Sequence, residues 1–413
     1  METKTYKLDS LCEITSSKRI FYSEYTESGI PFFRSKEIID LFNKNNIATE
    51  LFISKDRYNE IKNKFGVPEK DDMLLTSVGS IGIPYLVKSS DKFYFKDGNL
   101  TWFRNYNRKL IVPLYLYLWT TSSVGKETLM RLSMGAAQPA LTISRLKNLS
   151  LNLPSVSVQQ KIASILSTYD RLIENNTRRI RLLEQMAENL YKEWFVRFRF
   201  PEHEKVEMVN GLPKRWETIH IKELAQLKSG YAFKSEWFVE EGEAVAKIKD
   251  IGNILMDTSS FSYVDKENCF KAKKFLLTTG DLTIALTGAT IGKISIVPKH
   301  KGNIYTNQRL GKFFLGDKPI EKLPFLYCLF KQESMVSNIV NLSNSSSAQP
   351  NISPEQIEKI KILGNHDIIS MYNKTCNPLF SNILALYSQN QLLTRQRDLL
   401  LPRLMSGKLE VKS

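Results

Sequence analysis

Hydrophobic and polar positions along the chain follow two patterns, and each pattern occurs twice. Over about the first 150 residues, short apolar runs are broken by Gly, Pro, Asn and Ser, which is typical of strands and loops with few helices. Residues 72–87 place two apolar runs around a Gly-rich turn, and residues 281–297 repeat that arrangement. From residue 155 onward, apolar residues recur at steps of three and four, which predicts a long helix.

A second helical pattern follows the second strand-rich stretch. We predict that residues 155–200 and 365–413 form two long helices that pack antiparallel as a coiled coil, because the apolar steps persist over about four heptads. Pro378 lies inside the second pattern and lacks an amide donor, so the pattern leaves the continuity of that helix open. Asn176 and Asn390 fall on the apolar seams, where each either fixes the register or stays solvated.

The two halves of the chain are also related block by block. Five blocks recur in the same order at offsets of 209 to 213 residues, which indicates a tandem duplication. The fold class that follows is α+β, with two tandem-duplicated α/β domains, residues 1–154 and 201–364, separated by two long antiparallel coiled-coil helices. The paired blocks are residues 8–14 and 221–227, 29–38 and 242–251, 72–79 and 281–288, 112–117 and 323–328, and 137–142 and 348–353.

Charge supplies the first indication of a partner. The 413 residues include 58 Lys and Arg against 43 Asp and Glu, a formal net charge of +15. A basic protein attracts polyanions, of which nucleic acid is the commonest, although lysine-rich codon usage would also produce this charge. With no apolar run of about 18 residues and no signal-like N-terminus, we expect a cytoplasmic protein that does not enter a membrane.

No motif in the sequence satisfies the requirements of a catalytic or metal site. The four cysteines and four histidines are scattered without metal-ligand spacing. Residues 288–293 resemble a phosphate-binding loop, but three residues separate the glycines where four are needed, and Ile294 follows Lys293 where Ser or Thr is needed. Residues 377–380 lack the second proline of an adenine-methyltransferase motif. These absences favour a reader or a scaffold over an enzyme.

The order of globular domain, long helix, globular domain and long helix resembles the specificity subunit of type I restriction-modification systems. The resemblance covers nearly the whole chain, and it rests on the order and duplication of the blocks more than on any single one. Residues 29–38, 280–292, 138–142 and 349–353 look like segments of that family's target-recognition domains, and residues 153–162 and 398–407 look like its helix start and C-terminal end.

The resemblance implies a function for each part of the chain. Each globular domain would be a target-recognition domain that reads one half of a bipartite, asymmetric site in double-stranded DNA. The helices would set the spacer between the halves and dock two modification (methyltransferase) subunits, and ATP-dependent restriction subunits would join that core. S-adenosylmethionine, ATP and Mg would then act on the partner subunits, with no cofactor, metal or catalytic residue on this chain.

Basic residues that recur between the two copies are candidates for phosphate contacts. Arg34 and Lys36 occupy the positions that Lys247 and Lys249 occupy in the second copy. Lysine and arginine contacts with phosphate supply register and salt-sensitive affinity. The alternative for each residue is an exposed charge on a strand.

Hydroxyl- and Gly-rich turns, amides and divergent loops supply the other candidates. The turns would let the backbone approach DNA closely, or they are simply tight hairpins. An amide can pair bidentately with adenine, but a residue kept in two copies that read different bases favours a structural role. Loops that differ between the copies are where different base specificities would reside. The candidates are Thr76, Ser77, Ser80, Thr287, Thr290 and Lys293 at the turns, Gln138 and Gln349 as the amides, and Arg19, Tyr231 and Lys234 in the divergent loops.

Three other interpretations fit parts of the sequence. A specificity module from a related methylation-based defence system would share the fold and differ in its partners. An interaction scaffold would use the paired helices to hold two protein-binding domains, although the charge of +15 counts against it. An enzyme with an unfamiliar site would need catalysis by the isolated chain.

Overall fold

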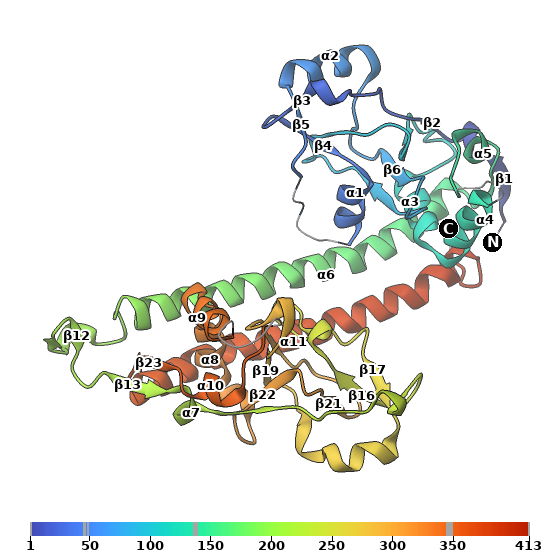
Figure 1. Ribbon diagram of the computed structural model, residues 1–413. Coiled ribbons are helices and arrows are strands. Elements are labelled where there is room, and N and C mark those ends of the chain that lie inside the picture. The colour runs from blue at the N-terminus through green and yellow to red at the C-terminus, as the bar shows by residue number, and fades with distance from the viewer. Residues whose placement is uncertain (1, 44–46, 48, 135–138, 344–349, 412–413) are drawn as a thin grey trace. The chain divides into compact units, whose positions relative to one another are not determined.

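The computed structural model describes residues 2–43, 47, 49–134, 139–343 and 350–411, and the chain divides into two compact units. Unit 1 comprises Met1–Leu172 with Leu393–Ser413, and unit 2 comprises Ile173–Leu392. The long helices α6 (Val156–Tyr191) and α11 (His366–Met405) each supply residues to both units (Figure 1).

Unit 1 is built on two four-stranded sheets and a strand pair. The first sheet has the order β2-β9-β6-β7 and is antiparallel, the second has the order β3-β5-β4-β8, and β1 pairs with β10. The strands are β1 (Lys4–Lys7), β2 (Glu13–Thr15), β3 (Tyr25–Thr26), β4 (Ile30–Phe33), β5 (Phe52–Ile53), β6 (Met73–Thr76), β7 (Pro84–Leu86), β8 (Tyr94–Phe95), β9 (Leu100–Arg104) and β10 (Ser150–Leu153). The shorter helices are α1 (Ser35–Phe42), α2 (Lys55–Phe65), α3 (Pro113–Thr121), α4 (Ser123–Ser133) and α5 (Ile143–Lys147).

Unit 2 repeats this plan with one more strand in its second sheet. Its sheets have the orders β14-β22-β19-β20 and β15-β17-β16-β21-β18, and β13 pairs with β23. The strands are β11 (Met208–Val209), β12 (Leu212–Pro213), β13 (Glu217–His220), β14 (Gln226–Ser229), β15 (Phe238–Val239), β16 (Glu243–Ala246), β17 (Ser262–Val264), β18 (Leu276–Leu277), β19 (Leu282–Ala285), β20 (Ile294–Ile296), β21 (Ile304–Thr306), β22 (Leu310–Phe314) and β23 (Lys361–Gly364). The α-helices are α7 (Ile221–Leu224), α8 (Leu323–Phe330), α9 (Glu333–Ser343) and α10 (Pro354–Glu358). The 3₁₀-helices of this unit are η4 (His203–Lys205), η5 (Ser235–Trp237), η6 (Ile248–Asp250), η7 (Lys266–Phe275), η8 (Gly288–Thr290) and η9 (Pro319–Glu321). Unit 1 has the 3₁₀-helices η1 (Leu8–Ser10) and η2 (Tyr22–Glu24).

The predicted duplication is confirmed in the pairing of the strands. The order β2-β9-β6-β7 corresponds to β14-β22-β19-β20, and β1–β10 corresponds to β13–β23. In each second sheet a parallel pair is embedded among antiparallel ones, β4 with β8 in unit 1 and β16 with β21 in unit 2. The predicted class, α+β with two α/β domains and two long helices, is therefore confirmed.

Within unit 2 the two long helices pack antiparallel through an apolar seam with polar contacts. The Tyr372 hydroxyl donates to the Ala187 carbonyl over 2.7 Å, while Asn176 donates to the Gln389 side chain over 3.0 Å, so rising numbers on α6 meet falling numbers on α11. The Asn390 amide donates to Thr177 Oγ1 over 3.2 Å. Both seam amides thus bond across the helix pair, as expected of groups that fix its register.

Pro378 does not interrupt the second helix. The helix α11 is continuous from His366 to Met405, and the side chains of Cys376, Phe380 and Ile383 around the proline have no exposed surface. Burial of these side chains in the core of unit 2 offsets the hydrogen bond that the proline cannot make. The first helix departs from its predicted end, because α geometry stops at Tyr191 and is followed by one π-helical turn, η3 (Lys192–Val196).

Within unit 1 the start of α6 also contacts the end of α11 through buried apolar side chains and a polar contact. Leu404 of α11 is buried in the core that contains Ile162 and Leu166 of α6. The Arg397 guanidinium donates to Asp170 Oδ1 over 2.7 Å, an ion pair whose two side chains are 26% and 37% exposed. None of the described helices is long and apolar enough to cross a lipid bilayer.

Candidate nucleic-acid interface

Arg34 and Lys247 occupy the same structural position in the two units. Each is the residue before a helical turn, the N-cap of α1 in unit 1 and of η6 in unit 2. The Arg34 amide donates to Glu37 Oε2 over 2.7 Å, and the Lys247 amide donates to Asp250 Oδ2 over 2.8 Å. The recurring basic-to-acidic spacing is therefore partly a helix-capping device.

The side chains at these positions and two residues after them differ in their exposure and in their contacts within the protein. Arg34 is 40% exposed and donates to Glu37 over 2.9 Å, and Lys36 is exposed. The Lys249 ammonium donates to the Ser260 carbonyl over 2.6 Å. The Lys247 ammonium lies 3.7 Å from the centre of the Phe238 ring, and burial together with the neighbouring Lys249 lowers the pKa of Lys247. An anion that approached this lysine pair would relieve the repulsion between the two cations.

The hydroxyl-rich turn of unit 1 connects β6 to β7. The Thr76 hydroxyl donates to the Ser80 carbonyl and accepts the Ile83 amide over 2.9 Å. Ser77 bonds to Thr101 over 2.6 Å, and both Thr76 and Ser77 are buried. The turn itself is made by Gly79, whose φ of +76° is a conformation that favours glycine. Of the predicted turn residues in unit 1, Ser80 is the exposed one.

The turn of unit 2, from β19 to β20, has the same geometry around Gly288 and Gly292, whose φ angles are +78° and +79°. Thr287 and Thr290 are half-buried, and Lys293 is exposed. The Thr290 hydroxyl is buried with no hydrogen-bond partner among the described residues.

In each unit the Gly-rich turn pairs with the block that contains the Gln-Pro dipeptide. Val78 forms a bridge with Ala140, and Thr287 forms the equivalent bridge with Asn351. The structure therefore brings these two repeated blocks together. Gln138 and Gln349 themselves lie outside the described residues, and a contact of either amide with adenine stays a prediction.

The three candidates in the divergent loops lie beside aromatic rings or carboxylates. Arg19 is exposed and pairs with Asp97 over 3.0 Å. Tyr231 is half-buried and stacks on Trp237, with ring centres 6.4 Å apart. Lys234 is exposed, with its ammonium 5.4 Å from the centre of the Trp237 ring. A DNA contact by any residue of the candidate set stays a prediction.

The sequence reasoning missed exposed aromatic side chains that lie within a few residues of Lys or Arg. Phe21 and Tyr22 of unit 1 are 61% and 90% exposed, and Phe270 of unit 2 is 71% exposed. Exposed apolar side chains that adjoin one another, as Phe21 and Tyr22 do, are typical of a contact surface. The available signal was an aromatic residue within two positions of Lys or Arg in a segment that differs between the copies, as in Arg19-Ile-Phe-Tyr22.

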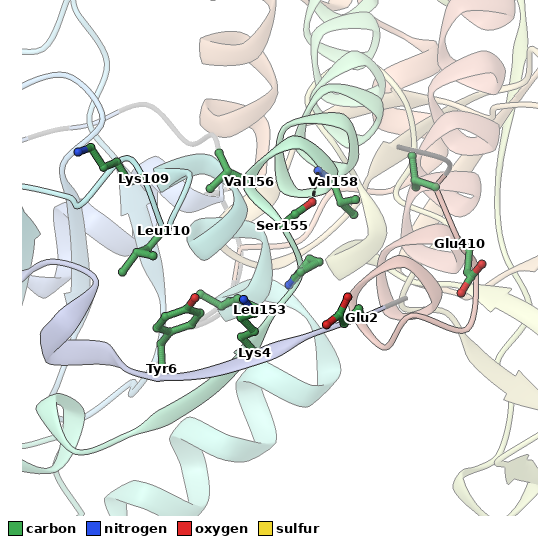
Figure 2. A pocket seen from close by; sticks show the side chains of 12 residues that line it. Glu2, Lys4, Tyr6, Lys109, Leu110, Leu153, Ser155, Val156, Val158 and Glu410 are labelled. Carbon is green, nitrogen blue, oxygen red and sulfur yellow. Dashed lines mark hydrogen bonds between the residues drawn. The ribbon is translucent and has the colours of Figure 1, made fainter.

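A hollow of about 1020 Å³ lies in unit 1 at the start of α6 (Figure 2). The Ser155 hydroxyl beside it accepts the Val158 amide over 3.5 Å and so caps the helix. Lys4, Lys109, Glu2 and Glu410 surround an otherwise partly apolar lining. With cations and carboxylates in equal number and neither cysteine nor histidine in the lining, the hollow offers no evident reactive group.

The cysteines are also unsuited to chemistry. All four are buried and free, and burial raises the pKa of Cys12 to about 12 and that of Cys376 to about 11, which leaves them as neutral thiols. Across the described residues, no three His, Cys, Asp or Glu side chains are grouped so as to hold a metal ion.

The residue that opens the first turn block, Asp72, is a buried acid that forms no ion pair among the described residues. It accepts the Trp102 indole N–H over 2.9 Å and the Glu69 amide over 3.0 Å, and burial raises its pKa to about 6. Because the folded-state pKa lies above the unfolded value of about 4, the folded chain binds the proton more tightly. Stability from this group is therefore greatest below pH 4 and is lost as the pH rises toward 6.

We expect Asp72→Asn to remove this pH dependence, because the amide oxygen keeps both hydrogen bonds without a charge. At pH 7 the variant should be about 2–3 kcal/mol more stable than the native chain, from about two pKa units at 1.4 kcal/mol each. The free energy of unfolding of both chains between pH 4 and 8 checks this. The matched control is Asp71→Asn, which makes the same change at the neighbouring residue. Asp71 is half-exposed, pairs with Arg108 and has a backbone conformation that asparagine tolerates. A native-like slope in Asp72→Asn would contradict the assignment.

Comparison with known proteins gives consistent matches. The family described as type I restriction modification DNA specificity domain matches residues 1–185 and again residues 213–363. The specificity subunit of the type I restriction enzyme HindI from Haemophilus influenzae is 25% identical over 90% of this chain and 93% of its own length. That of MjaIX from Methanocaldococcus jannaschii is 28% identical over 83% of this chain and 78% of its own length. The crystal structure of the type I restriction-modification S subunit from M. genitalium has the same fold, with a TM-score of 0.60 at 19% identity, covering 100% of this chain and 97% of that one.

Proposed function

Because the chain belongs to the family of type I restriction-modification DNA specificity domains, we propose that it is the sequence-reading subunit of such a complex. Each unit reads one half of a bipartite, asymmetric site in double-stranded DNA. The long helices set the spacer and dock two modification subunits, which carry S-adenosylmethionine, and ATP-dependent restriction subunits join them with Mg. The chain itself supplies no catalytic group.

The observation that carries this proposal is the repetition of one strand order with different exposed side chains. Units 1 and 2 share their sheets and turns, yet unit 1 exposes Phe21 and Tyr22 where unit 2 has Lys234 and Ser235. A common backbone with different surface chemistry is what two readers of different half-sites need. The net charge of +15 supports a polyanionic target.

Selection from a randomised duplex pool tests the proposal, with the protein copurified together with whatever binds it in its native host. We expect enrichment of two short, different motifs at a fixed gap. A single contiguous motif would leave DNA binding in place and contradict the two-reader geometry. Without enrichment at any salt concentration, the chain would be an interaction scaffold instead.

Lys247→Ala combined with Lys249→Ala is expected to weaken binding similarly on every duplex. If both ammonium groups contact phosphates, the slope of log affinity against log salt falls by about 2, at 0.9 per phosphate. The measurement is a binding titration over a range of KCl concentrations on a selected and an unrelated duplex. Arginine at both positions keeps the charge and serves as the control. An unchanged slope in the alanine variant would refute the phosphate contacts.

A further inference from the structure

The helix η7 of unit 2 (Lys266–Phe275) presents one buried row and two solvent-facing rows of side chains. In a 3₁₀-helix residues three apart lie above one another, so the ten residues form three rows. Cys269 and Ala272, in the row that begins at Lys266, are 2% and 0% exposed. They pack with Val245, Val264 and Tyr305 in a small core, and so anchor the helix.

The two outer rows are basic and carry one large apolar side chain. Phe270 is 71% exposed, and the Lys273 ammonium lies 4.4 Å from the centre of its ring, one turn along the same row. Lys271 and Lys274 occupy the other outer row, and both are exposed. Together with exposed Lys266 at the start of the helix, four lysines face solvent with a single acid, Glu267, among them.

None of these four lysines is paired with an acid in the part of the chain that the structure describes. Among the residues that the structure describes, no carboxylate lies within ion-pair distance of any of their ammonium groups, nor do the side chains of Lys266, Lys271 and Lys274 make any other polar contact. The N-terminus of η7 is closed by Asp265, whose side chain accepts the Glu267 amide over 3.1 Å. The helix is thus fixed at its base while its cations remain available.

The equivalent helix of unit 1, α2 (Lys55–Phe65), is arranged differently on its outer side. Its anchoring residues are Tyr58 and Ile61, 6% and 0% exposed, at the same spacing as Cys269 and Ala272. On its surface, however, Arg57 pairs with Glu24 and Glu60 over 2.7 and 2.8 Å, and Lys64 pairs with Glu60 over 3.0 Å. The duplication has preserved the buried row and part of the outer surface, because Lys55 and Lys62 stand at the positions of Lys266 and Lys273. The other outer positions differ: Asn59, Glu60 and Asn63 stand where unit 2 has Phe270, Lys271 and Lys274.

We propose that the exposed side of η7 is a duplex-DNA contact surface of unit 2. It is formed by Phe270, Lys271, Lys273 and Lys274 of the two outer rows and by Lys266, which is exposed where the buried row begins. The lysines neutralise phosphates along one strand, and Phe270 packs against deoxyribose or the apolar edge of a base. At about 2 Å of rise per residue the lysines extend over roughly 16 Å, long enough to follow several successive phosphates. This inference rests on the proposed function and names the element that supplies salt-dependent affinity in unit 2.

The test compares three variants of the full chain, copurified with its partners, on a selected duplex and an unrelated duplex of equal length. With glutamine at Lys266, Lys271, Lys273 and Lys274, we expect the salt slope to fall by about 2–4 on both duplexes and the affinity at low salt to fall at least tenfold. Arginine at the same four positions keeps the charge and should keep the slope. Phe270→Ala should keep the slope and lose roughly threefold to tenfold in affinity.

The outcomes distinguish a failure of the proposed function from a failure of the inference about η7. If the native protein binds no duplex, the proposed function and the inference about η7 are both wrong. If the native protein binds and the glutamine variant keeps its full slope, the inference about η7 is wrong while the proposed function stands. Loss of partner subunits from the glutamine variant, with unchanged DNA binding, would assign the face to a protein contact and overturn the inference. Thermal unfolding of each variant confirms that the outward substitutions leave the fold intact.

Discussion

Replacing Lys312 with methionine is expected to destabilise unit 2 by about 3–5 kcal/mol, because the substitution leaves a buried carboxylate without its cation. The Lys312 ammonium lies 2.6 Å from Asp281 Oδ2, and the two side chains are 13% and 2% exposed. The same ammonium donates to the Leu276 carbonyl over 2.8 Å. One lysine therefore connects β22 to the starts of β18 and β19.

Denaturant unfolding at pH 7 measures this effect, and two further variants identify its cause. Combining Lys312→Met with Asp281→Asn removes both charges and should recover most of the lost stability. Lys318→Met removes a lysine that is 77% exposed and paired with Glu321, so it should cost less than about 1 kcal/mol. A Lys312→Met chain as stable as the Lys318→Met chain would show that the ion pair contributes little to the fold.

The corresponding acid in unit 1 shows why this pair could not be predicted from the repeats. Asp72 and Asp281 open the same repeated block, yet Asp72 is satisfied by the indole of Trp102 at the position where unit 2 has Lys312. Which residue meets the acid depends on the register between β6 and β9 or between β19 and β22, which local sequence patterns do not determine.

The architecture, in contrast, was accessible to sequence reasoning. The duplicated blocks predicted two equivalent domains, because they recur in the same order and one pair of them ends in equivalent turn glycines, Gly79 and Gly288. The helical steps predicted the antiparallel helices α6 and α11. The exception was Pro378, where a local rule against helix continuity is outweighed by burial of the side chains around it.

The candidate interface was less accessible, because capping and packing use the same residue types as DNA binding. Arg34 and Lys247 stand out in the sequence as repeated cations, but each also begins a capped turn whose acid is buried. Thr76 was a candidate because it lies in a hydroxyl-rich turn, but its hydroxyl forms hydrogen bonds within that turn. The outer rows of η7 have a period of three rather than 3.6, so the search for ordinary helical faces overlooked Phe270.

Glutamate at both Leu182 and Met186 is expected to abolish docking of a modification subunit on α6, weakening it at least 100-fold. These side chains are 50% and 56% exposed and lie four residues apart, on the same face of the helix. Ala187, which is fully buried, faces α11, so the two outward residues are not needed for the helix pair. The buried centre of a protein interface is depleted of charged residues and enriched in Met, so two carboxylates placed there should cost about 3 kcal/mol, or about 100-fold in affinity.

Pull-down of the modification subunit without DNA measures this docking, so that an effect on DNA binding does not enter. The matched control places glutamate at Met208 and Val209 in the hairpin β11–β12, which are 54% and 47% exposed and receive the same added charge. We expect the control to retain the subunit, because the hairpin lies outside the paired helices. If the hairpin variant loses the subunit and the helix variant retains it, the docking surface is the hairpin, and α6 serves the helix pair alone.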